Sequence, residues 1–150
     1  MSSEATTQDA ELIVKLYDLR REPVMREARA FIAQFSPKSL EDLMALAMAA
    51  GSKENAYVRQ VTGYWEMAAS LVNRGALNRE LALDNYSELF FVYAKIAPYV
   101  EDFRQRMGMP MFCRQIQQLV ESSAENKQRL ADMQKMQAEM ARRRAEAAGA

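Results

Sequence analysis

Apolar residues recur along most of the chain at spacings of three and four, which is the pattern of amphipathic helices. Residues 9–21 give one example, with Leu12, Ile13, Leu16 and Tyr17 on a single helical face. No run alternates apolar and polar residues in the manner of a half-buried strand. The pattern therefore predicts an all-α protein, a compact bundle of about six helices followed by a helical C-terminal extension.

Proline, serine and glycine residues mark the ends of the predicted helices. Pro23 suits the first turn of a second helix, and Ser39 suits the N-cap of a third, with Asp42 completing an approximate capping box. Gly51 and Gly75 stand where the third and fourth helices should end in the left-handed conformation. These signals place helix boundaries without any knowledge of tertiary contacts.

The longest apolar stripe runs from Asn78 to Phe103 and predicts a helix at the centre of the bundle. Pro98 lies inside this stripe. Because proline lacks a backbone donor and crowds the carbonyl four residues earlier, we predict a kink or short break at 94–98. A last bundle helix is predicted to begin near Pro110.

Residues 126–150 differ in character from the rest of the chain. They contain no aromatic residue, valine or isoleucine, and six basic residues against three acidic ones give them a net charge of +3. The whole chain is neutral, so residues 1–125 carry −3. We predict a flexible N-terminus over 1–8, a bundle over 9–125 and a projecting basic helix over 126–150.

Composition excludes several kinds of chemistry. The chain has no histidine, which removes the commonest general base and metal ligand, and Cys113 is its single cysteine. No glycine-rich phosphate loop is present, so we expect no cofactor. The absence of a secretory leader pattern and the lone thiol predict a cytoplasmic protein without a membrane span.

One segment carries a family resemblance. Residues 64–104 contain an aromatic-Glu pair, an Arg-Gly-x-Leu turn, an acidic-Leu helix start, a Pro-Tyr pair and a final arginine. These positions are Trp65-Glu66, Arg74-Gly75-Ala76-Leu77, Glu80-Leu81 with Asp84, Pro98-Tyr99 and Arg104. The pattern resembles an uncharacterised family of all-helical bacterial domains of unknown function. The resemblance implies the helical fold and no activity.

The same segment supplies a candidate pocket or packing cluster. Its members are the large or polar residues on facing stripes, namely Tyr64, Trp65, Glu66, Tyr86, Tyr93 and Arg104. The tryptophan is expected in the core with its indole N–H on an acceptor. Glu66 is expected to pair with Arg104 or Arg59, a structural role in preference to a catalytic one.

Two further constellations have simpler structural explanations. Asp84 and Glu88, with Glu66 and Glu80, offer carboxylates for a metal, but bundle metal sites also use histidine, so we expect a solvated acidic face and no metal. Cys113 near a helix start invites a reactive thiolate. With no histidine to act as its base, it is expected to be a buried apolar residue.

The leading functional hypothesis is a non-catalytic, self-associating interaction or scaffold domain, with a second copy or another helical protein as partner. The candidate interaction residues form a short stripe on the extension, namely Leu130, Met133, Met136 and Met140. Two alternatives stay open: a ligand-binding or enzymatic bundle with a Tyr/Glu-lined pocket, and contact with an anionic surface through Arg142–Arg144. Because acids dilute that basic run and no aromatic residue is interleaved with it, we expect neither nucleic-acid binding nor peripheral membrane contact.

Overall fold

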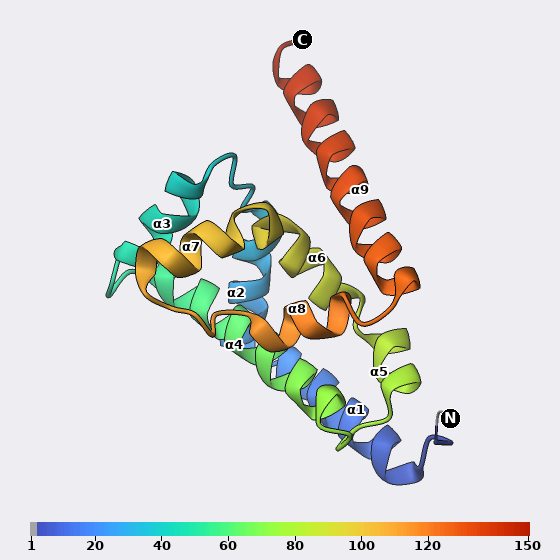
Figure 1. The fold of residues 1–150 in the computed structure, drawn as a ribbon. Coiled ribbons are helices and arrows are strands. Elements are labelled where there is room, and N and C mark those ends of the chain that lie inside the picture. The colour runs from blue at the N-terminus through green and yellow to red at the C-terminus, as the bar shows by residue number, and fades with distance from the viewer. Residues whose placement is uncertain (1–2) are drawn as a thin grey trace.

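The structure, a computed structural model, describes residues 3–150, and the regular secondary structure of this range is all helical (Figure 1). It contains no strand within the described range. Its elements are α1 (Thr7–Arg20), α2 (Pro23–Gln34), α3 (Leu40–Met48), α4 (Lys53–Asn73), α5 (Arg79–Asn85), α6 (Ser87–Ile96), the 3₁₀ turn η1 (Ala97–Tyr99), α7 (Val100–Met107), α8 (Arg114–Val120) and α9 (Ala124–Ala148). The all-α prediction is confirmed.

The predicted number of bundle helices, about six, is too low, because the described body has eight before α9. The long helix predicted from Asn78 is divided into α5, α6 and α7. The break at Pro98 lies where the sequence placed it and takes the form of η1. The break at Tyr86 has no proline or glycine to signal it, and it turns the Tyr86 side chain into the core. The last bundle helix also begins at Arg114 instead of Pro110.

The predicted helix ends agree with the structure where a capping residue signals them. Pro23 occupies the first turn of α2, and Ser39 accepts a hydrogen bond from the Asp42 N–H at the start of α3. The Asp42 carboxylate accepts from the N–H of Lys38, so the capping box is only approximate. Gly75 follows α4 with a φ of +74°, a conformation that glycine adopts without steric cost.

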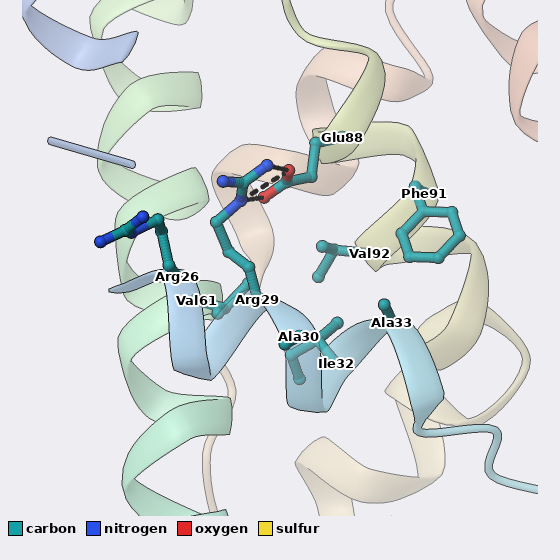
Figure 2. Close-up of a pocket in the computed structure, with 9 residues that line it drawn as sticks. All are labelled: Arg26, Arg29, Ala30, Ile32, Ala33, Val61, Glu88, Phe91 and Val92. Atoms are coloured by element: carbon teal, nitrogen blue, oxygen red, sulfur yellow. Dashed lines mark hydrogen bonds and ion pairs between the residues drawn. The ribbon is translucent and has the colours of Figure 1, made fainter. Parts of the chain in front are cut away.

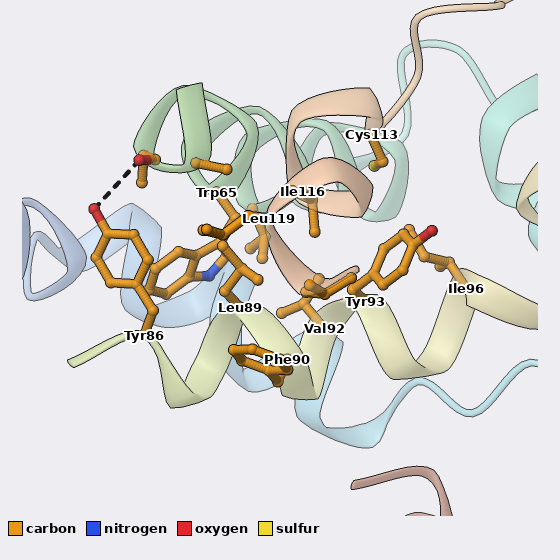
Figure 3. Packing of buried hydrophobic residues seen from close by; sticks show 14 of the residues in the cluster. Trp65, Tyr86, Leu89, Phe90, Val92, Tyr93, Ile96, Cys113, Ile116 and Leu119 are labelled. Atoms are coloured by element: carbon orange, nitrogen blue, oxygen red, sulfur yellow. Dashed lines mark hydrogen bonds between the residues drawn. The ribbon is translucent and has the colours of Figure 1, made fainter. Parts of the chain in front are cut away.

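Helices α4 and α6 form the centre of the body. Trp65 and Val61 of α4, and Leu89 and Phe90 of α6, are almost completely buried. Ile116 and Leu119 of α8, which packs against α4, point into the same core and face α6, as Figure 3 shows. The apolar stripe that predicted a central helix, within residues 78–103, therefore includes the buried face of α6.

Helix α9 leaves the body as a projecting arm (Figure 1). Ser123 caps its start by accepting from the Asn126 N–H. Its first half packs along α6 through Leu130 and Met133. All residues of 141–150 are exposed. None of the helices in the described range combines the length and apolar composition needed to cross a bilayer.

Candidate functional site

Three members of the predicted aromatic cluster come together between α1, α4 and α5. The Trp65 ring lies edge-on to Tyr64 at 4.9 Å between ring centroids and to Tyr86 at 5.2 Å. The Tyr64 hydroxyl donates to the Leu16 carbonyl at 2.6 Å, and the Tyr86 hydroxyl donates to the Ala68 carbonyl at 3.3 Å. These bonds join helices, so the tyrosine hydroxyls have structural partners.

Burial governs the ionisation of these tyrosines. It raises the pKa of Tyr64 to about 12 and raises the pKa of Tyr86 further, because a phenolate loses more solvation than a phenol. Burial also raises the pKa of Tyr93. All three therefore remain neutral at physiological pH and act as hydrogen-bonding groups, not as bases.

The polar centre of the body is an ion cluster around Glu88. Arg29 binds this carboxylate through its Nε at 2.9 Å and its Nη2 at 2.6 Å, and the Arg20 Nη1 lies 3.6 Å away. The indole N–H of Trp65 also donates to Glu88, at 3.3 Å. The three charged side chains are only 14% (Arg20), 33% (Arg29) and 17% (Glu88) exposed, so the cluster places an excess of one positive charge in a half-buried position.

The sequence analysis considered Glu88 as one of a set of acidic side chains on a solvated face, and the structure instead places it among arginines. Glu88 faces two guanidinium groups, and the described residues contain no cluster of three acidic, cysteine or histidine side chains that would hold a metal ion. Arg29 was not among the predicted site residues. It lies 59 positions from Glu88, and neither residue has a local motif that would connect them.

A groove of about 310 Å³ opens beside this cluster, between α2 and α6 (Figure 2). Its floor is apolar, and the Arg29–Glu88 pair closes one end. The lining residues are Arg26, Arg29, Ala30, Ile32, Ala33, Val61, Glu88, Phe91 and Val92. The groove combines an apolar floor with the guanidinium groups of Arg26 and Arg29. Its volume lies at the lower end of the range for small-molecule sites.

Glu66 and Arg104 of the predicted cluster do not pair with each other. The Glu66 carboxylate accepts from the backbone N–H groups of Gln115 at 2.8 Å and Ile116 at 3.1 Å, so it caps the start of α8. Arg104 is buried, donates to the Phe112 carbonyl at 2.8 Å and forms an ion pair with Glu101. Both residues hold α8 and the preceding loop against the body.

Cys113 precedes α8 and is buried, with a left-handed φ of +54°. Burial raises the pKa of its thiol, which is the opposite of what a reactive thiolate requires. The prediction of a buried, apolar role agrees with this environment.

A second, more open groove of about 480 Å³ lies between α4 and the loop before α8. Met109 and Met111 flank it as exposed thioethers, and Gly63 and Arg59 of α4 form part of its wall. A side chain at Gly63 would meet no other group within 4 Å, so the groove is unobstructed there. We call this feature the methionine groove.

The predicted stripe on the C-terminal helix is divided by the structure. Leu130 and Met133 pack against the core, whereas Met136 and Met140 are each 44% exposed. The Gln137 side chain makes the outermost hydrogen bond to the body, donating to the Phe91 carbonyl at 2.8 Å. We call residues 138–148 together with Met136 the distal half of α9.

Comparison with known proteins identifies a family. A family model described as a domain of unknown function (DUF4760) matches residues 5–123. No curated protein and no solved structure matches the chain. The matched range contains the Glu88 cluster and both grooves and stops immediately before α9.

Proposed function

The chain belongs to the DUF4760 family of domains of unknown function, and on that premise we propose that it is a non-catalytic interaction domain that pairs with a second copy of itself. The observation that carries the proposal is the distal half of α9, which extends from the body with Met136 and Met140 exposed. A short helix without tertiary contacts is marginally stable in water, because its stability comes mainly from packing an apolar face. A second copy supplies that packing.

The methionine groove is the surface that best fits this helix. It is apolar and open above Gly63, which permits close approach of a helix backbone. Met109 and Met111 have flexible, polarisable side chains that adapt to an incoming apolar group. In the proposed dimer, Met136 and Met140 of one copy insert into this groove of the other.

Charge and symmetry favour a reciprocal arrangement. Residues 126–150 carry a net charge of +3 and residues 1–125 carry −3, so the arm of one copy is attracted to the body of the other. A two-fold axis makes each copy contribute one arm and one groove. A stable interface buries roughly 1,200–2,000 Å². Two arm-and-groove contacts related by the axis bury twice the surface of one, which brings the dimer closer to this range.

The other functional hypotheses have less support. Glu66 is occupied as a helix cap and Cys113 is a buried thiol, which leaves neither residue placed for catalysis. In the basic run, Arg142 and Arg143 form ion pairs with Glu139, and residues 126–150 hold no aromatic side chain that would add to contact with an anionic surface.

The test compares two charge-matched double variants of the full chain. Met136→Glu with Met140→Glu places carboxylates on the exposed apolar side of α9, whereas Ala138→Glu with Ala145→Glu places the same charges on the opposite side of the helix. Light scattering over a concentration series should give a dimer for the wild type and the alanine-site variant, and a monomer for the methionine-site variant. Met111→Glu, in the groove, should also give a monomer.

Two results would contradict the proposal. The first is a monomeric wild type over the whole concentration range, which would direct the search to a different helical partner. The second is a dimer that persists in both the Met136/Met140 and the Met111 variants, which would place the interface elsewhere on the body.

A further inference from the structure

The groove between α2 and α6 has the shape of a narrow slot for an apolar chain. Ile32, Val61 and Val92 form its floor, and the Phe91 ring stands at one side (Figure 2). Ala30 and Ala33 line the opposite edge, where their small side chains leave the slot open. None of these six residues offers a polar side-chain group, so the body of any occupant should be apolar.

Cations surround this slot and a single carboxylate faces them. Arg29 and Arg20 share Glu88, while Arg26 on the rim has no ion pair among the described residues. Lys95 lies one turn beyond Phe91, with its Nζ 4.7 Å from that ring centroid. Its hydrogen bonds go to the carbonyls of Ala33 and Phe35 and not to an acid.

The arm adds to this charge and does not neutralise it. Burial and, to a smaller extent, the nearby guanidinium of Arg144 lower the pKa of Lys95, and no carboxylate raises it. Because the chain as a whole is neutral, the excess of positive charge around the slot is a local feature. An anionic group with an apolar body complements both properties of the site.

We propose that the groove between α2 and α6 binds a free medium-chain monocarboxylate, with its chain along the apolar floor and its carboxylate at Arg26 and Arg29. A guanidinium group has five N–H donors in a planar fork that matches a carboxylate. Arg29 directs three of these N–H groups to Glu88 and to the Arg20 carbonyl, so two remain for a ligand. The Arg26 guanidinium, on the exposed rim, supplies the second fork.

Trp65 provides a reporter for this binding. It is the single tryptophan of the chain, and its indole N–H donates to Glu88. A ligand carboxylate at Arg29 changes the field at Glu88 and therefore the environment of the indole. Decanoate, below its micellar concentration, should change the Trp65 emission saturably, and calorimetry on the full chain should give the same affinity.

Matched ligands separate the two parts of the proposal. Decanol keeps the chain without the charge, and acetate keeps the charge without the chain. Each should bind at least about tenfold more weakly than decanoate. Equal binding of decanol and decanoate would overturn the proposal, and so would a decanoate titration without saturation in either measurement.

Variants locate the site. Arg26→Gln should weaken decanoate binding about tenfold, whereas Arg106→Gln, the same charge change at an exposed residue of α7, should leave it unchanged. Ala33→Phe should fill the slot and abolish binding, with circular dichroism confirming that the helices are retained. Equal weakening by Arg26→Gln and Arg106→Gln would reduce the effect to net charge and refute the site. Because these measurements do not depend on the dimer, they test the groove independently of the arm.

Discussion

The carboxylate of Glu66 caps the start of α8 and fixes that helix to α4. Glu66 sits on α4 and accepts two backbone N–H groups at the start of α8, where a helix has donors without intrahelical partners. The preceding residue, Cys113, has no capping side chain and a left-handed conformation. The cap therefore comes from another helix, about 50 residues earlier in the chain.

Removal of this cap has a measurable expected cost. Glu66→Ala should lower the free energy of unfolding by about 1–2 kcal/mol, because it leaves two half-buried donors unpaired. Glu66→Gln, which keeps one acceptor oxygen, should lose less. Urea denaturation measures both, with Glu11→Ala as a control for removing an exposed helical carboxylate. A Glu66→Ala variant as stable as the control would mean that water satisfies these groups equally well.

In the cluster around Glu88, the sequence predicted that Trp65 has an acceptor but did not predict the arginine partners of Glu88. The Trp65 indole was expected to find an acceptor, and it donates to Glu88. The pairing of Glu88 with Arg29 and Arg20 could not be predicted, because the two arginines lie on α1 and α2, far from α6 in the sequence. Only packing brings these side chains to one point.

At the scale of elements, α4 offers a controlled comparison of two glycines. Gly63 lies inside the helix and Gly75 follows its end with a φ of +74°. A Cβ at either position would meet no other group within 4 Å. In the Met136→Glu/Met140→Glu background, where no second copy approaches Gly63, any difference between their alanine variants therefore reports on backbone conformation and not on steric contact.

The two alanine variants should change stability in opposite directions. Gly63→Ala should raise the free energy of unfolding by about 0.5–1 kcal/mol, because alanine loses less backbone entropy in a helix. Gly75→Ala should lower it by about 1–2 kcal/mol, because the left-handed conformation is strained for a residue with a Cβ. Thermal unfolding of both variants in the Met136→Glu/Met140→Glu background, against that background alone, gives the comparison. The same sign for both would contradict the assigned roles.

Helix boundaries differ in how far the sequence specifies them. The starts of α3 and α9 follow from Ser39 and Ser123, whose side chains accept a hydrogen bond within the first turn. The break at Tyr86 does not follow from a local signal. It depends on the burial of that ring against Trp65, which is a tertiary contact.

At the scale of the whole molecule, the buried tyrosines make stability sensitive to alkaline pH. In the unfolded chain a tyrosine has a pKa near 10, whereas burial raises the pKa of Tyr64 in the folded chain to about 12. Tyr86 and Tyr93 shift in the same direction. A raised folded-state pKa gives stability that is complete below pH 10 and is lost as the pH rises from 10 through 12.

Burial also raises the pKa of the Cys113 thiol, so ionisation of this thiol in the unfolded chain should begin to lower the urea midpoint near pH 9, and the tyrosines should make the midpoint fall steeply above pH 10. Phenolate absorbance should show three of the six tyrosines ionising only with unfolding. Tyr64→Phe should reduce the slope of stability against pH between 10 and 12. An unchanged slope would mean that this hydroxyl is accessible to solvent.

The sequence by itself determined the features that depend on residues close together in the chain. The helical class, the break at Pro98, the glycine after α4 and the helical state of the basic C-terminal segment all follow from interactions within one or two turns, which a local pattern records. Tertiary structure alone decided the partners of Glu66 and Glu88, the burial of Tyr86 and the two grooves. These depend on which helix faces pack together, and a spacing of three and four identifies an apolar face without identifying what covers it.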